Sequence, residues 1–216
     1  MNPPGAYCYG PTEPPPPASD PAWGNHDPTA GSIYQCPGPP ITYIFVGNGQ
    51  APLPDPRVLA QRALDQLDLA VPAIHIAPDP PLATYVGLET WLWLPEAQWD
   101  SLSLTVTAGA TSVTVTAAPV RVDWGLTEGS TSCSSVGRPW VRGMSSNAQT
   151  DCSYTFSTLS DGQPDGKYDV SATITYSATW TCSGACLIDN GDLGEVPSLT
   201  SNDAIEVDER QSVVVQ

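Results

Sequence analysis

Two stretches of the sequence decide the fold: Val120-Arg-Val-Asp-Trp-Gly-Leu-Thr-Glu-Gly129, and the run from Tyr168 to Cys182. In the second stretch Asp, Ser and Thr alternate with Val170, Ala172, Ile174, Tyr176, Ala178, Trp180 and Cys182. Because successive side chains of a strand point to opposite faces, this period of two predicts one long antiparallel strand with a buried and a wetted face. Val120, Val122 and Trp124 repeat the pattern, so we expect Trp124 and Trp180 in the core.

The rest of the second half has the same pattern in shorter pieces. Residues 102–106, 113–117 and 120–124 predict three strands, and Cys152, Tyr154 and Phe156 predict another inward-facing set. We expect loops over 127–150 and 189–201, and a last strand over 205–215. Short strands, turn signals and no alternating helices indicate a mainly β chain, with an antiparallel β-sandwich over 100–216.

The first half is predicted as a stalk and a small α+β segment. Residues 1–30 hold nine prolines and almost no aliphatic side chain, which predicts a disordered proline-rich stalk, with an SH3-type ligand as the alternative. In residues 31–99, segments 33–36 and 41–46 predict a short hairpin or two edge strands. One helix is predicted over 56–68, with Asp55 as its N-cap. A strand over 73–77 and a strand over 87–94, buried on both faces, follow.

The charge balance excludes two classes of partner. The net charge is −16 with only 7 Lys and Arg, so the basic patch needed to bind nucleic acid or an anionic membrane is missing. No apolar run reaches the 18 residues of a membrane-spanning helix. We therefore predict an acidic protein without nucleic acid, nucleotide or membrane span.

The six cysteines indicate disulfides. A zinc site or a catalytic thiol is the alternative, but the only histidines are His26 and His75, and the cysteine spacing does not match a zinc motif. We predict three pairs: Cys8 with Cys36, Cys133 with Cys152, and Cys182 with Cys186. Disulfides imply an oxidising compartment, so we expect a secreted or cell-surface protein whose signal peptide has been removed.

The sequence contains no set of residues that fixes a chemistry. Glu89, Asp123 and Glu128 carry no catalytic signal among 23 acids, and no histidine lies near a serine elbow, so we predict no enzyme. Calcium is the one cofactor to consider, because two sets of acids could supply oxygen ligands: Asp161, Asp165 and Asp169, and Asp189, Asp192 and Glu195. Solvated acidic turns are the favoured interpretation of both sets, so we predict no metal. The candidate ligand contacts are Trp91, Trp93, Trp99 and Trp140, although burial is the favoured interpretation of Trp91 and Trp93.

Three segments resemble the PKD domain. These are residues 122–130 (Val-Asp-Trp-Gly-Leu-Thr-Glu-Gly-Ser), 152–156 (Cys-Ser-Tyr-Thr-Phe) and 166–175 (Gly-Lys-Tyr-Asp-Val-Ser-Ala-Thr-Ile-Thr). Leu-Thr-Glu stands where that family has a run such as Phe-Gly-Asp, so we expect a remodelled turn after Trp124. Residues 58–64, 86–94 and 191–196, with Cys133 and Asp151-Cys152, are similar to a family of secreted actinobacterial proteins that have a proline-rich lead and a PKD-like sandwich.

The resemblance implies location and fold more than an activity. PKD-like (Ig-like) sandwiches serve as spacers and as modules that contact proteins or polysaccharides. We therefore expect a secreted, non-catalytic structural or interaction module with an extracellular protein or cell-wall partner. The alternative is a carbohydrate-binding module that uses exposed tryptophans.

We predict that the chain binds neither ATP nor GTP. The nearest approach to a phosphate loop, Gly162-Gln-Pro-Asp-Gly-Lys-Tyr168, lacks one residue between the glycines and the Ser or Thr after the lysine, which such a loop needs for magnesium. Isothermal titration calorimetry checks this, and saturable binding in the micromolar range would contradict it.

Overall fold

The computed structural model describes residues 9–36, 41–49, 53–145 and 147–210. As predicted, they are mainly β, and they contain one α-helix. The chain divides into two compact units. The first consists of Met1–Leu67, Ser103–Val115 and Thr179–Leu193, and the second of Asp68–Leu102, Thr116–Ala178 and Gly194–Gln216. Each unit therefore combines segments that lie far apart in the sequence.

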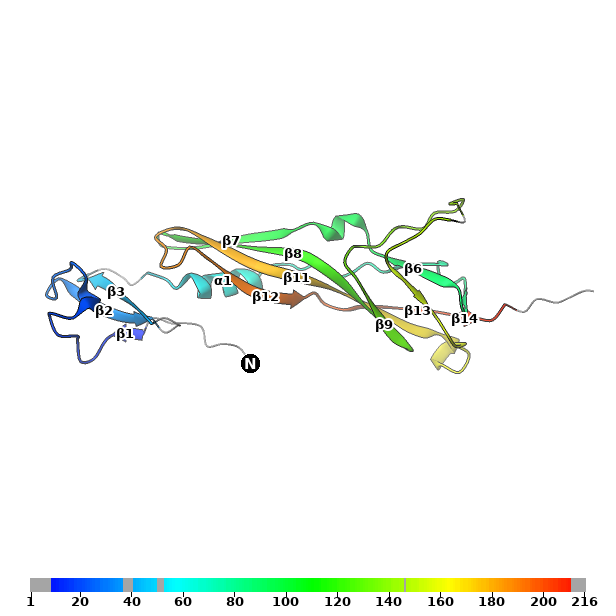
Figure 1. Cartoon of the computed structure of the whole chain (residues 1–216), viewed down its shortest axis with the longest axis horizontal. Helices are drawn as coiled ribbons and strands as arrows, with labels where there is room; N and C mark the ends of the chain where they lie inside the picture. The colour runs from blue at the N-terminus through cyan, green and yellow to red at the C-terminus, as the bar shows by residue number, and fades with distance from the viewer. Residues whose placement is uncertain (1–8, 37–40, 50–52, 146, 211–216) are drawn as a thin grey trace, which may run out of the picture. The chain divides into compact units, whose positions relative to one another are not determined.

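The largest sheet is built on two long neighbouring strands, β8 (Thr111–Leu126) and β11 (Tyr168–Gly184), which Figure 1 shows side by side. The strand predicted from Tyr168 to Cys182 is confirmed and continues to Gly184. The strand order is β12-β11-β8-β7, with β9 paired to β8 and β13 paired to β11. These four further strands are β7 (Leu102–Ala108), β9 (Gly129–Cys133), β12 (Asn190–Pro197) and β13 (Ser201–Ile205).

One face of β11 forms the core. Trp180 is 2% exposed and Trp124 of β8 is 1% exposed, which confirms both predicted core tryptophans. The other inward-facing side chains of β11 are buried as well: Val170, Ala172, Ile174, Tyr176 and Ala178. The period of two therefore identified the buried face of this strand correctly.

β8 continues through Pro119, where the sequence predicted a break between two strands. Its buried apolar positions are odd-numbered before Pro119 and even-numbered from Val122 onward: Val113, Val115 and Ala117, then Val122, Trp124 and Leu126. One extra residue in a strand, as in a β-bulge, produces this change of parity, and Pro119 has no N–H to pair. Val120 lies in the irregular part and is 37% exposed, so the prediction that it shares the buried face of Trp124 was wrong.

Two stretches expected to be loops contain strands. β9 forms a hairpin with β8 inside 127–150, and β12 pairs with β11 inside 189–201. Neither strand has an apolar alternation in its sequence, which is why periodicity did not predict them. In the structure only Cys133 of β9 is buried, and no residue of β12 is buried. Gly191 of β12 packs against the Trp180 indole, where a Cβ would lie 2.7 Å from ring atoms.

The C-terminal strand predicted over 205–215 differs from the structure. β13 ends at Ile205, and β14 (Val207–Asp208) pairs in parallel with β5 (Thr84–Tyr85). Residues 211–216 lie outside the described residues. Val207 is 1% exposed, so the apolar alternation here marked a buried position but not the length of the strand.

A three-stranded sheet in the second unit contains the predicted Trp-Leu-Trp strand. Its order is β10-β6-β4, with β6 (Glu89–Trp93) between β10 (Ser153–Thr155) and β4 (His75–Ala77). Thr90, Trp91 and Leu92 are all buried, which confirms burial on both faces at the centre of this strand. Leu88 precedes β6 and is 43% exposed.

The first unit contains a second three-stranded sheet, in the order β1-β2-β3. The predicted hairpin is confirmed as the antiparallel pair of β2 (Gly31–Cys36) and β3 (Thr42–Gly47). Residues 9–30 are not the disordered stalk that was expected: they form β1 (Tyr9–Pro11), the 3-10 helix η1 (Pro21–Trp23) and turns. The reason is Trp23, which is 4% exposed and whose indole N–H donates to the carbonyl of Pro17 at 3.0 Å.

The one α-helix among the described residues is α1 (Pro56–Asp65). The Asp55 carboxylate accepts the Arg57 N–H at 2.9 Å, which confirms the predicted N-cap. The helix ends at Asp65 and not at Asp68, because the Gln66 N–H closes the last turn on the Ala63 and Leu64 carbonyls. Four apolar side chains of the helix are buried, as expected of an amphipathic helix: Leu59, Ala60, Ala63 and Leu64. Leu67, which follows the helix, is partly buried.

Two of the three predicted disulfides are confirmed. Cys133 at the end of β9 is bonded to Cys152, and Cys182 of β11 is bonded to Cys186 in the following turn. Their Cα–Cα distances are 5.5 and 6.1 Å, within the usual range for a disulfide. The pair Cys8 and Cys36 lies outside the described residues, because Cys8 and the Cys36 side chain are not described.

Replacing Trp124 or Trp180 by Ala should lower the free energy of unfolding by about 3–5 kcal/mol, because the change removes a buried indole and leaves a cavity. The matched control is Trp140→Ala, since Trp140 is 45% exposed. We expect a change of at most about 0.5 kcal/mol there. Denaturant unfolding followed by circular dichroism measures all three variants, and equal midpoints would contradict this assignment of the core.

Candidate functional site

A polar network occupies the face of the largest sheet opposite to Trp124. The Asp123 carboxylate of β8 accepts hydrogen bonds from Ser132 Oγ at 2.8 Å and from Thr175 Oγ1 at 2.9 Å. Arg121 Nε donates to both Asp123 oxygens at 3.0 and 3.2 Å, and Arg121 Nη1 donates to Glu195 at 2.8 Å. The network therefore ties β9, β11 and β12 to β8.

The hydrogen bonds of Asp123 control its protonation. Burial alone would raise the pKa of this carboxyl, but the hydroxyls of Ser132 and Thr175 and the charge of Arg121 outweigh burial and hold the pKa below its usual value. Such a carboxylate stabilises the fold above the ordinary carboxyl pKa, and the contribution is lost as the pH falls through the lowered value. A general acid or base at neutral pH needs a raised pKa, so this environment suits a structural carboxylate.

Glu128 and Glu89 have similar structural partners. Glu128 accepts the Ser157 N–H at 2.6 Å and the Thr158 hydroxyl at 2.8 Å, and so joins the turn between β8 and β9 to the segment after β10. Burial raises the pKa of Glu128, but these hydrogen bonds outweigh burial and lower it. Glu89 accepts the Ser153 hydroxyl at 2.8 Å across the β6–β10 pair. Each of these acids holds two segments of the chain together.

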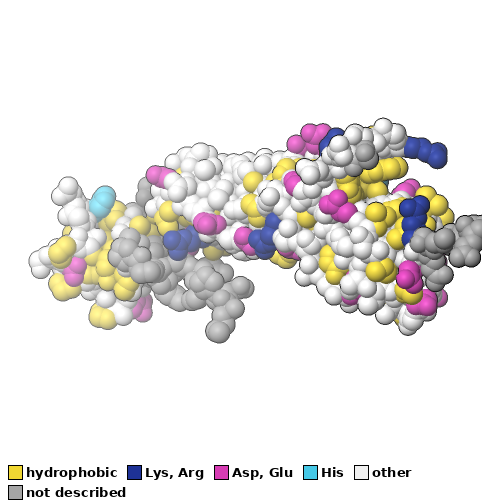
Figure 2. All heavy atoms as spheres, turned by 45° about the vertical axis from the view of Figure 1, so that its right-hand side comes forward, with side chains coloured by type: hydrophobic (Ala, Val, Ile, Leu, Met, Phe, Trp, Pro, Cys, Tyr) yellow, Lys and Arg dark blue, Asp and Glu magenta, His cyan; other side chains and the backbone are white. Residues whose placement is uncertain are grey.

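The two acidic sets weighed for calcium do not assemble a metal site. No group of three His, Cys, Asp or Glu side chains placed to hold a metal ion occurs in the described ranges. Asp165 has φ of 55° in a tight turn, a conformation that Asp tolerates, and Glu195 is paired with Arg121. In the face that Figure 2 shows, acidic side chains are spread over several places and form no single patch.

The four tryptophans proposed as ligand contacts do not form one platform. Trp91 is 7% exposed, Trp93 and Trp99 are partly buried, and Trp140 is exposed. Among the described residues no ring contact joins two of them, and the Trp93 indole stacks instead on His75, with ring centroids 5.5 Å apart and planes at 11°. His75 is exposed, so this stack is open to solvent on the imidazole side.

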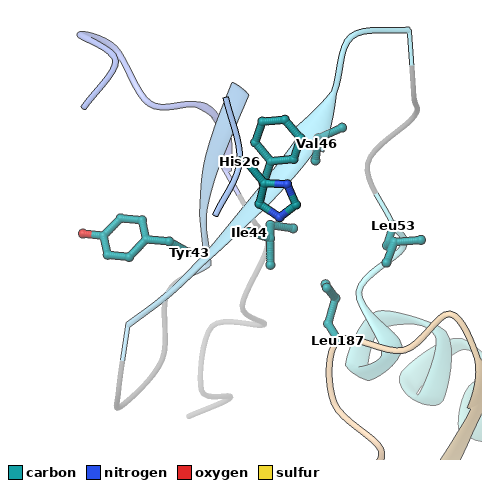
Figure 3. Close-up of a pocket in the computed structure, with 7 residues that line it drawn as sticks. His26, Tyr43, Ile44, Val46, Leu53 and Leu187 are labelled. Atoms are coloured by element: carbon teal, nitrogen blue, oxygen red, sulfur yellow. The ribbon is translucent and has the colours of Figure 1, made fainter. Parts of the chain in front are cut away.

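A groove that the sequence did not predict lies along β3 in the first unit. Its volume is about 660 Å³, within the range of sites that hold small ligands or peptide segments. Seven residues line it, all of them uncharged or histidine: His26, Tyr43, Ile44, Phe45, Val46, Leu53 and Leu187. Figure 3 shows Leu53 and Leu187 across the groove from Ile44 of β3.

The groove runs along the edge of β3. Residues 43–46 are four consecutive residues of one strand, and they point alternately to its two faces. All four can line one groove only where the groove follows the edge of the strand. β3 is the last strand in the order β1-β2-β3 of the described residues, so the edge facing the groove has no neighbouring strand there.

The aromatic side chains at the groove are held by contacts from η1 and the turn after it. The His26 imidazole stacks on Phe45 with ring centroids 4.2 Å apart and planes at 4°, and Trp23 meets the same ring edge-on. Tyr43 is 49% exposed and Leu53 is 38% exposed. The one sequence signal for this site was the apolar strand around Ile44. In the opposite wall Leu53 follows β3 closely in the chain, and Leu187 comes from a distant part of it.

No helix in the described residues is long and apolar enough to cross a membrane. Comparisons with protein-family models, with curated proteins and with solved structures found no match.

Thr175→Val should raise the pKa of Asp123, because it removes a hydroxyl that donates to the ionised carboxylate. The loss of stability on acidification should accordingly begin at a higher pH. Thr173→Val is the matched control: Thr173 lies on the same strand but bonds to Thr200. Carboxyl chemical shifts titrated by NMR measure the pKa, and an equal shift in both variants would argue against the network.

Proposed function

We propose that this protein is a non-catalytic extracellular interaction module, secreted or held at a cell surface, whose largest sheet belongs to a PKD-like or Ig-like β-sandwich. The partner is an extracellular protein or a cell-wall component that binds in the groove along β3.

The observation that carries the proposal is the groove itself. An unpaired strand edge offers backbone N–H and C=O groups to an extended segment, and alternate side chains of that segment then meet the two faces of the sheet. The wall of this groove is apolar and aromatic, and two of its side chains, Tyr43 and Leu53, are substantially exposed. A soluble protein gains from an apolar surface of this kind mainly when a partner covers it.

The two disulfides support the location. Bonds such as Cys133–Cys152 and Cys182–Cys186 persist in oxidising compartments and are rare in the cytosol. Cys133–Cys152 joins the end of β9 to the segment before β10, and Cys182–Cys186 closes the turn that follows β11. Both bonds therefore brace the sheet at points where its strands end.

The sandwich assignment is supported by the alternation of β8 and β11 around two buried tryptophans. The hairpin of β8 and β9 follows Trp124 directly, where the PKD resemblance implied a turn. The non-catalytic assignment is supported by the partners of the acids, since Asp123 and Glu128 have lowered pKa values and bind hydroxyls of their own chain.

Carbohydrate binding remains the second candidate, because of two observations on the indoles. Trp140 is 45% exposed, and the Trp93–His75 stack includes an exposed imidazole. Flat apolar rings of this kind contact sugar rings. The four indoles share no ring contacts within the part of the chain that the structure describes, so a sugar would meet them singly.

The test is binding of the oxidised, labelled full chain to intact cells of its source. We expect saturable binding that Tyr43→Asp weakens at least about tenfold, the loss expected from placing a charge in an apolar contact. Ile41→Asp is the matched control, because Ile41 is 54% exposed, precedes β3 and does not line the groove.

The other outcomes separate the candidates. Binding that persists in Tyr43→Asp, but is lost in Trp140→Ala and displaced by soluble wall polysaccharide, favours carbohydrate recognition. Absence of saturable binding by the wild-type chain, or protection of the native protein from protease added to intact cells, would overturn the proposal.

A further inference from the structure

The groove along β3 presents apolar side chains on both faces of its strand edge. Tyr43 and Phe45 point to one face, and Ile44 and Val46 point to the other. A strand added at this edge would therefore meet apolar neighbours on both of its own faces. A segment that alternates apolar and polar residues would place its polar side chains against the apolar β3 side chains on one of the two faces. The groove therefore favours a segment that is apolar at consecutive positions.

The opposite wall limits what can enter. Leu53, just before α1, and Leu187, in the turn after the Cys182–Cys186 disulfide, lie across from β3 (Figure 3). A second sheet pairing edge to edge would need room beyond its first strand, and this wall occupies that room. The groove therefore suits a single extended segment.

The chain itself contains a segment with these properties. Residues 211–216 are Gln-Ser-Val-Val-Val-Gln, which lie outside the described residues and have no charged side chain, in a chain of net charge −16. Val213 and Val215 would face one side of an added strand and Val214 the other, and valine has high strand propensity. Residues 212–215 equal in number the four β3 residues that line the groove, with Ser212 at one end and three consecutive valines after it.

We propose that residues 212–215 of one copy add as a strand to the β3 edge of a second copy, so that the chain assembles head to tail. This inference rests on the proposed function, because it names the partner that the groove of the module binds. The groove and the segment are different surfaces, so each copy can donate one and accept one. Such a heterologous contact produces open series of copies and no closed dimer, unless the rotation between copies closes a ring.

The experiment uses two full-length variants, each of which damages one half of the contact. Tyr43→Asp places a charge in the groove at an exposed position and leaves the segment intact. Val214→Asp places a charge in the segment and leaves the groove intact. Sedimentation equilibrium from about 1 µM to about 1 mM covers the affinities expected of a short docked segment.

We expect the wild-type chain to form a concentration-dependent series and each variant alone to remain monomeric. An equimolar mixture of the two should form one-to-one dimers and nothing larger. The intact segment of Tyr43→Asp can bind the intact groove of Val214→Asp, and no second contact can form because the other groove and the other segment are both damaged. Ile41→Asp, the matched control outside the groove, should associate like the wild type.

Three results would overturn the inference. A wild-type chain that is monomeric throughout, as it would be if the segment bound its own groove or none, excludes assembly between copies. Association of Val214→Asp alone means that β3 pairs with something other than this segment. A mixture that stays monomeric while the wild type associates breaks the required complementation. Groove-dependent binding to cells together with a monomeric wild type would leave the proposed function standing and this inference refuted.

Salt dependence gives an independent reading. Two acidic chains repel each other, and added salt screens that repulsion, so an apolar contact should strengthen as salt is raised. Weaker association at higher salt would indicate ion pairs and contradict an apolar docked segment.

Discussion

The pairing of β8 with β11 is the constraint on which the largest sheet depends. On one face it places Trp124 in the core together with the alternate apolar side chains of β11. On the other face the same pairing brings the Thr175 hydroxyl to the Asp123 carboxylate at 2.9 Å. A shift of one residue in the register would expose the indole and bury the carboxylate. Burial on one face and hydrogen bonding on the other therefore both stabilise the observed register.

The acidic composition is used in part to hold the strands together. Asp123, Glu128 and Glu89 each accept hydroxyl or backbone donors from a neighbouring segment. Arg121 bridges Asp123 and Glu195 and so includes β12 in the network. Exposed ion pairs of this kind contribute little individually, but a shared carboxylate with several donors fixes the relative positions of the strands.

The edges of the largest sheet and of the β1-β2-β3 sheet differ in chemistry. β12, at one end of the largest sheet as described, has no buried residue and carries Asp192 and Glu195, so it is a polar edge that discourages pairing with other chains. β3, the last strand of the β1-β2-β3 sheet, instead presents consecutive aromatic and β-branched side chains at its edge. That contrast within one chain is the reason for assigning recognition to β3.

The sequence by itself determined the features that depend on local chemistry. The period of two along β11 identified its buried face, Asp55 and Pro56 identified the start of α1, and the cysteine spacing identified two disulfides. Only the tertiary structure determined that polar β9 and β12 are strands, since backbone pairing with β8 and β11 stabilises them without an apolar pattern. It also determined that residues 9–30 are ordered around Trp23, and that Leu53 and Leu187 face β3 across the groove. Each of these features depends on which segments of the chain meet, and periodicity carries no information about that.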